Sequence, residues 1–196
     1  MTAAETAEGS EDVRGRSRRE QILAAAAGQF GAHGFHGANM RDVAAAAGVL
    51  VGSIYYHFPS KEALFVAVHG AAVDMMTGAV RGATLGIADP WDRLEAAAAA
   101  HCEMLNSDNS FVGVIAPSVP ASLAHLRAQL TVQRDAYETL FSEMIANLSL
   151  EEEIDAKLFR LHLLAALNGT KFWYSPGGRT PADIGRQLVR MFRGPA

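Results

Sequence analysis

The chain has 196 residues, of which 49% are hydrophobic and 19% charged, and its formal net charge is −4. This length allows one domain, or a small domain fused to a larger one, and the apolar fraction excludes a disordered chain. Alanine accounts for 36 residues and favours helices over strands, which argues against an all-β sandwich or barrel.

Cysteine usage and the N-terminal residues bear on the cellular compartment. The single cysteine, Cys102, cannot form an internal disulfide and offers no cysteine cluster for a metal. Residues 1–12 are acidic and small, unlike a signal peptide, and the uncharged stretch 21–40 contains too many polar residues to span a membrane. We therefore expect a cytoplasmic protein with no cofactor, no bound metal and no membrane partner.

The charge is distributed unevenly along the chain. Residues 1–12 carry −4, residues 13–61 carry +4, and the remaining 135 residues carry −4. A local basic block is the electrostatic footprint of a nucleic-acid contact, although a solvated arm gives the same pattern. Charge alone leaves both interpretations open, and we expect residues 1–13 to form a disordered acidic tail.

Capping residues mark the beginnings of the first four helices. Ser17 and Glu20 form a capping box, in which each side chain can bond a free backbone amide of the other residue. Asn39 and Ser60 are further residues of the N-cap type. We expect these helices over residues 17–34, 39–48, 50–58 and 61–81.

The later helices are predicted from similar signals. Asp89 is a capping residue followed by proline at the first helical position, Ser149 and Glu152 form a second capping box, and Pro181 begins the last helix. We expect helices over residues 90–105, 121–148, 150–174 and 181–193, with a loop and a short helix over 106–120. The sequence thus predicts an all-α fold of about nine helices.

Two short helices meet at a glycine turn near residue 48. Ala44 is small where the two helices must approach closely, and Gly48 permits the left-handed turn conformation. The residues spaced to fill the wedge between the helices are Val43, Ala47, Val49 and Ile54. This is a helix–turn–helix pattern, in which the second helix enters the major groove of DNA. An ordinary helical hairpin is the alternative that the pattern alone leaves open.

The wider context of this turn is more specific. Residues 41–64 read RDVAAAAGVLVGSIYYHFPSKEAL, and the stretch 19–65 resembles the DNA-binding domain of the TetR family of transcriptional regulators. The resemblance implies a helix–turn–helix domain over residues 14–65 and a helical ligand-binding and dimerisation domain over 66–196. It also implies a homodimeric repressor of a near-palindromic operator, released by a small effector.

The expected recognition helix carries residues suited to DNA. Gly52 lets the backbone approach base edges, and the Ser53 hydroxyl can donate or accept a hydrogen bond. Tyr55 and His57 suit phosphate oxygens, with packing against the first helix as the alternative, and Tyr56 suits a phosphate or a thymine methyl. By resemblance, the DNA-contacting positions are Val51, Gly52, Ser53, Tyr55, Tyr56, His57 and Lys61, with Arg41, Arg14, Arg16 and Arg18 as phosphate or minor-groove contacts.

Leu50 departs from the family pattern. Members of the family often carry Ser or Thr at this position, where the side chain caps the recognition helix. Leucine cannot accept the capping hydrogen bond, and this loss costs about 0.5–2 kcal/mol. We therefore expect either a different start of the helix or a Leu50 side chain packed against the core.

The C-terminal part offers residues for an effector pocket. Methionine and aromatic side chains give adaptable apolar contacts, but apolar residues at helical spacing are equally typical of plain core. His101 and His162 can be core histidines, and no cysteine or carboxylate at ligand spacing supports a metal site. The candidates for the pocket are His101, Met104, Leu105, Phe111, Tyr137, Phe141, Met144, His162 and Trp173.

A finer resemblance concerns residues 168–184. They look like the end of the penultimate helix in TetR-type regulators of lipid metabolism that respond to acyl-CoA thioesters, although Ser175 stands where that subgroup usually has arginine. An acyl-CoA and a neutral apolar effector both remain open. In the family the last two helices form the dimer interface, for which the candidates here are Leu158, Leu161, Ala165, Leu188 and Met191.

Two other classes of function remain as alternatives. One is an enzyme with a catalytic pair hidden in a helical pocket, and the other is a helical interaction module with a vestigial DNA-binding motif. The chain lacks a G-x-S-x-G motif, a phosphate-binding loop, a dinucleotide-binding glycine motif and a zinc signature. We therefore expect no enzymatic activity and no catalytic residues.

Overall fold

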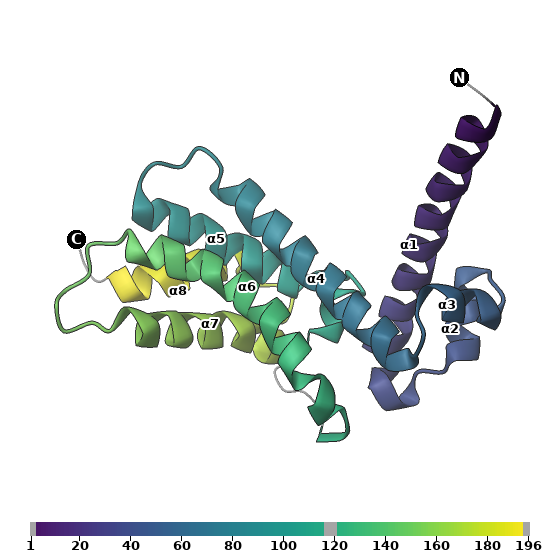
Figure 1. Ribbon diagram of the computed structural model, residues 1–196. Coiled ribbons are helices and arrows are strands. Elements are labelled where there is room, and N and C mark those ends of the chain that lie inside the picture. The colour runs from purple at the N-terminus through teal and green to yellow at the C-terminus, as the bar shows by residue number, and fades with distance from the viewer. Residues whose placement is uncertain (1–2, 116–120, 194–196) are drawn as a thin grey trace.

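A computed structural model describes residues 3–115 and 121–193, except for the side chains of residues 3–17 and 121–122. This part of the chain consists of eight α-helices and two short 3-10 segments, without strands. The all-α prediction is confirmed, and the helix number is close to the expected nine. The molecule is elongated, with α1–α3 at one end and α5–α8 at the other, and α4 joins the two (Figure 1).

The bounds of the elements agree with most of the predicted helices. The two 3-10 segments are η1 (Val112–Val114) and η2 (Ala121–Leu126). The α-helices are α1 (Ala3–Gly37), α2 (Met40–Ala47), α3 (Val51–His57), α4 (Lys61–Thr84), α5 (Pro90–Leu105), α6 (Arg127–Ala146), α7 (Ala156–Trp173) and α8 (Pro181–Arg193). The expected acidic tail over residues 1–13 falls largely on α1. The domain limits at 14–65 and 66–196 stay predictions.

Local hydrogen bonds explain why α2 and α4 begin where they do. The Asn39 side chain accepts a hydrogen bond from the Arg41 amide at 2.9 Å, and Gly48 ends α2 in the left-handed conformation with φ 64°. The Ser60 hydroxyl oxygen accepts from the Ala63 amide at 3.1 Å. These caps confirm the predicted starts of both helices.

Two predicted helix starts are wrong. Residues 121–126 wind as the tighter η2, within which Leu123 departs from helical geometry with φ −104° and ψ 16°, so α6 begins only at Arg127. The capping box at Ser149 does not open α7. Asp155 takes that role, because its carboxylate accepts a hydrogen bond from the Leu158 amide at 2.9 Å.

Two apolar clusters form the interior, and α4 contributes to both. The N-terminal core consists of the buried apolar residues between 22 and 68 together with Val114, Leu123, Leu126 and Leu130. The C-terminal core joins α4 from Val73 onward with the buried apolar residues of α5, the second half of α6, α7 and α8. Burial of apolar area is the main source of stability, so each end of the molecule has its own core.

Of the helices described, α4 is the one whose length and composition alone would allow it to cross a membrane. Its apolar side chains pack instead against the protein. Leu64 and Val68 are buried in the N-terminal core, whereas Met76 and Val80 are buried in the C-terminal core. A helix shared by two cores needs apolar residues on several faces, which accounts for its hydropathy.

The contact between α5 and α8 is unusually close. A Cβ atom added to Gly185 of α8 would lie 2.3 Å from the backbone oxygen of Ala98 in α5. Alanine in the run 96–100 keeps the facing surface of α5 equally small. The two helices therefore approach backbone to backbone, and α5 is fixed against the C-terminal end of the chain.

We predict that Gly185→Ala lowers the free energy of unfolding by about 1–3 kcal/mol, because the added methyl meets backbone that cannot rotate away. Gly78→Ala is the matched control. Its added methyl meets no atom within 4 Å in α4, and alanine there favours the helix by up to about 1 kcal/mol. Urea unfolding of both variants measures the difference, and equal stabilities would contradict the close contact.

Candidate functional site

The helix–turn–helix is built from α2, the Gly48 turn and α3. Ile54 is the one buried residue of α3 and packs in the N-terminal core with Val43 and Ala44 of α2. The Val49 amide donates to the Ala44 oxygen at 3.0 Å, which closes the turn. The single buried side chain fixes which face of the short helix points outward.

The outward face of α3 carries most of the predicted DNA contacts. Gly52 and Tyr56 are four residues apart and share a helical face, and the Tyr56 side chain is 87% exposed. No atom lies within 4 Å of a Cβ built on Gly52, so the backbone there is open to a close approach. Ser53 lies beside them and is partly buried.

Tyr55 and His57 do not behave as core residues. Tyr55 is 48% exposed, and His57 is partly buried with its ring 5.1 Å from the ring of Tyr56. Tyr55 therefore does not pack inside the fold and His57 does so only in part, whereas Val51, another predicted DNA contact, packs against the N-terminal core.

The basic residues near α3 are held by aromatic rings. The Lys61 ammonium lies 4.6 Å above the ring of Phe35, and the Arg19 guanidinium lies 5.1 Å above the ring of Phe58. Arg41 is exposed, as is Arg18. The side chains of Arg14 and Arg16, which were also predicted to contact DNA, lie outside the described residues.

The structure corrects both expectations for Leu50. The recognition helix begins directly after it, at Val51, so Leu50 occupies the N-cap. Its side chain makes no capping hydrogen bond and does not pack in the core, because it is 81% exposed. Only its backbone takes part, since its carbonyl oxygen accepts from the Ser53 amide at 2.9 Å.

A polar contact connects α4 to α6 between the two cores. His69 Nδ1 and Gln133 Oε1 are 2.7 Å apart, and Gln133 Nε2 donates to the Val66 oxygen at 3.3 Å. Gly70 leaves room for this glutamine, because a Cβ there would lie 2.9 Å from Gln133 Nε2. Sequence reasoning missed this contact, since the two residues are far apart in the chain.

Three of the residues predicted for an effector pocket pack together in the C-terminal core. His101 Nδ1 hydrogen-bonds to the Tyr137 hydroxyl at 2.8 Å, and the His101 ring lies edge-on to Phe141 at 6.0 Å. Burial lowers the pKa of His101 to about 4 and raises the pKa of Tyr137. Both groups are therefore neutral at neutral pH.

The other predicted pocket residues are dispersed. Leu105 is buried, Met104 packs partly buried against the C-terminal core, and Phe111 packs against the N-terminal core. His162 and Trp173 are exposed on α7. The nine residues therefore do not line one cavity.

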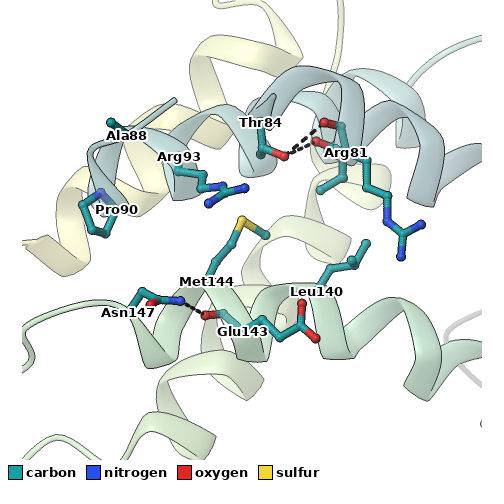
Figure 2. A pocket seen from close by; sticks show the side chains of 10 residues that line it. Arg81, Thr84, Ala88, Pro90, Arg93, Leu140, Glu143, Met144 and Asn147 are labelled. Carbon is teal, nitrogen blue, oxygen red and sulfur yellow. Dashed lines mark hydrogen bonds between the residues drawn. The ribbon is translucent and has the colours of Figure 1, made fainter. Parts of the chain in front are cut away.

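A cavity of about 400 Å³ lies instead between the end of α4, the beginning of α5 and the end of α6 (Figure 2). Of the nine residues predicted for an effector pocket, only Met144 lines this cavity. Figure 2 shows Arg93 and Glu143 on opposite sides of this space. The lining consists of Val80, Arg81, Thr84, Ala88, Pro90, Arg93, Leu140, Glu143, Met144 and Asn147.

An apolar surface is exposed on the last two helices. Leu158, Leu161 and Ala165 are exposed on α7, and Met191 is exposed on α8. Leu188 is partly buried against the C-terminal core. Sequence reasoning missed Phe172, which is also exposed on α7 and would have been visible as one more aromatic residue near the end of that helix.

Comparisons with known proteins agree with this arrangement. The family described as bacterial regulatory proteins, tetR family, matches residues 22–68, and a tetracyclin repressor-like C-terminal domain matches residues 88–194. The HTH-type transcriptional repressor KstR2 of Rhodococcus jostii is 29% identical over 190 residues, which cover 93% of each chain.

Two further proteins are similar over most of the chain. The HTH-type transcriptional activator FasR of Mycolicibacterium smegmatis is 30% identical over 157 residues, covering 80% of this chain and 72% of that protein. The solved structure of AibR in complex with isovaleryl coenzyme A and operator DNA has a TM-score of 0.73 at 24% identity, covering 89% of this chain and 97% of that one.

The buried His101 predicts a loss of stability in acid. Because its pKa is lowered from 6.5 to about 4 in the folded state, the unfolded chain binds more protons between these values. Stability is then full above pH 6.5 and falls by about 2 kcal/mol from this group between pH 7 and pH 5. We expect urea unfolding of His101→Gln to show a shallower pH dependence than the wild type, and equal slopes for the two proteins would contradict this role of the buried imidazole.

Proposed function

The chain belongs to the TetR family of bacterial regulatory proteins and is a DNA-binding transcriptional regulator, and we propose that it acts as a homodimeric repressor released by a small amphipathic effector. The observation that carries this proposal is the outward face of α3, where Gly52 and Tyr56 are exposed and Ser53 lies partly buried beside them. The relative KstR2 is named a repressor, which supports this direction of control.

The second copy needed for a near-palindromic operator has a suitable surface. Leu158 and Leu161 on α7 and Met191 on α8 expose apolar area at the end of the molecule away from α3 (Figure 1). Apolar area of this kind is buried when two copies pair through a two-fold axis. Such a pair would present two recognition helices to successive major grooves, about 34–36 Å apart.

The chemistry of the cavity suggests the class of effector. Val80 and Met144 are buried and give it an apolar wall, whereas Arg81 and Arg93 contribute two cations against the one carboxylate of Glu143. Neither guanidinium forms an ion pair with another described residue. We propose an effector with an apolar body and an acidic group, such as an acyl-CoA or another lipid-like acid. Arg81 and Arg93 would supply the positive charge that the related subgroup has at the position of Ser175.

The effector would act through α4. Val80, Arg81 and Thr84 line the cavity at the C-terminal end of α4, while Leu64 at its other end is buried in the N-terminal core, to which α3 contributes its buried residue, Ile54. A ligand that prefers one position of α4 shifts the population of the dimer between two separations of the recognition helices. The released state is the one whose separation does not match the operator.

The alternatives have less support. The relative FasR is named an activator, so the same architecture is compatible with the opposite direction of control. The relatives are named regulators, and the buried His101, which the enzyme alternative would use, is hydrogen-bonded to Tyr137 inside the core. A module with a vestigial motif does not account for the exposed face of α3.

We expect the logarithm of the DNA affinity to fall linearly with the logarithm of the salt concentration, because phosphate contacts release counterions. Lys61→Gln should reduce this slope by about 1 and weaken all sequences alike, whereas Ser53→Ala should change the preferred bases. Arg179→Gln, which removes an exposed charge far along the chain, is the control. Fluorescence anisotropy on a selected operator measures all three, and binding that is independent of salt would contradict the proposal.

The cavity gives a second prediction. Decanoyl-CoA and decanoate should bind more tightly than decanol, and Arg93→Gln should weaken the two acids by about tenfold, the size of one charged hydrogen bond. Binding of decanol should change little, and Arg179→Gln again serves as the control. Isothermal titration calorimetry measures these affinities, and equal affinities for acid and alcohol would rule out the role of the arginines.

A further inference from the structure

Leu50 is an exposed leucine whose position neither local structure nor the core explains. It sits at the N-cap of α3, where a polar side chain would bond a free amide, and its own side chain makes no such bond. It also contributes nothing to the core, since 81% of it is exposed. A role for this side chain therefore has to come from what the helix approaches.

The position of Leu50 places it on the DNA-facing surface. It directly precedes α3, and the residues that follow it on that helix, Gly52 and Tyr56, face outward. When a recognition helix enters the major groove, the residues of its leading end come nearest to the base edges. In the complex proposed above, Leu50 would therefore meet bases rather than solvent.

The chemistry of leucine restricts what it can read there. Its side chain has neither a donor nor an acceptor, so it gains nothing from the hydrogen-bonding groups of any base. The one apolar feature of a base pair in the major groove is the C5 methyl group of thymine. Contact with that methyl removes apolar surface of both partners from water.

We propose that Leu50 is a specificity-determining residue that selects a thymine in each operator half-site through contact with its methyl group. This inference rests on the proposed DNA-binding function and deepens it at the same site. A hydrophilic capping residue at this position would hold a phosphate or the helix amides and would not distinguish thymine from cytosine. Leucine gives up that contact and makes the position sensitive to a methyl group.

The test uses an operator fragment selected by the full-length protein, in which single thymines are replaced by uracil. This change removes only the methyl group. For the wild type we expect one position in each half-site where uracil weakens binding by about fourfold, the equivalent of one buried methyl. In Leu50→Ala the difference between thymine and uracil at that position should disappear, whereas Leu50→Met, which keeps the apolar reach, should retain most of it.

Leu85 provides a matched control. It is also a helix-flanking leucine, 83% exposed, but it follows α4 at the opposite end of the molecule (Figure 1). Leu85→Ala should leave the thymine profile unchanged, and thermal unfolding checks that Leu50→Ala folds normally. A thymine profile of Leu50→Ala equal to that of the wild type, or no uracil-sensitive position in the wild type, would overturn the inference. Failure of the wild type to retain any DNA would instead reject the proposed function.

Discussion

The arrangement of the molecule depends on one constraint, which is that the long helix α4 is packed into two separate cores, with α6 beside it reaching from Leu130 in one core to Phe141 in the other. Its first half is buried with α1–α3 and its second half with α5–α7. With 24 residues, α4 is about 36 Å long, and it has no break along this length. A packed helix transmits displacement because close-packed interiors deform little. The contact of His69 with Gln133 fixes α4 to α6 between the two cores.

The recognition helix is stabilised in the opposite way, by very few contacts. With seven residues, α3 is too short to be stable by itself, and isolated helices of this length are not populated in water. Its orientation comes from the buried Ile54 and from the Gly48 turn. The basic block around it is likewise local, since residues 13–61 carry +4 while the remainder of the chain is acidic. The surface suited to DNA is therefore small, and the short helix that carries it has only one buried side chain.

The features predictable from the sequence were those with local causes. Asn39, Ser60 and Gly48 act on amides and dihedral angles within a few residues, so their patterns identified the helix limits. The capping box at Ser149 failed because Asp155 offered an alternative cap six residues later, and local pattern does not rank two caps. The cavity was not predictable, because the spacing of apolar residues is the same in a packed core and in a cavity wall. Its exposed arginines, Arg81 and Arg93, resemble ordinary solvated charges until the fold brings α4 and α5 together.

Leu50 shows how a local defect becomes informative in the context of the fold. A serine at this N-cap would stabilise α3 equally in the free protein and in any complex, so it would add nothing to discrimination between DNA sequences. Leucine omits that stabilisation and contributes free energy only where its surface is covered. Specificity is the difference in binding free energy between two DNA sequences, and a contact made with only one of them contributes its whole free energy to that difference. With leucine in place of serine at this N-cap, α3 is less stable in the free protein. The same leucine increases the difference in affinity between the operator and other DNA.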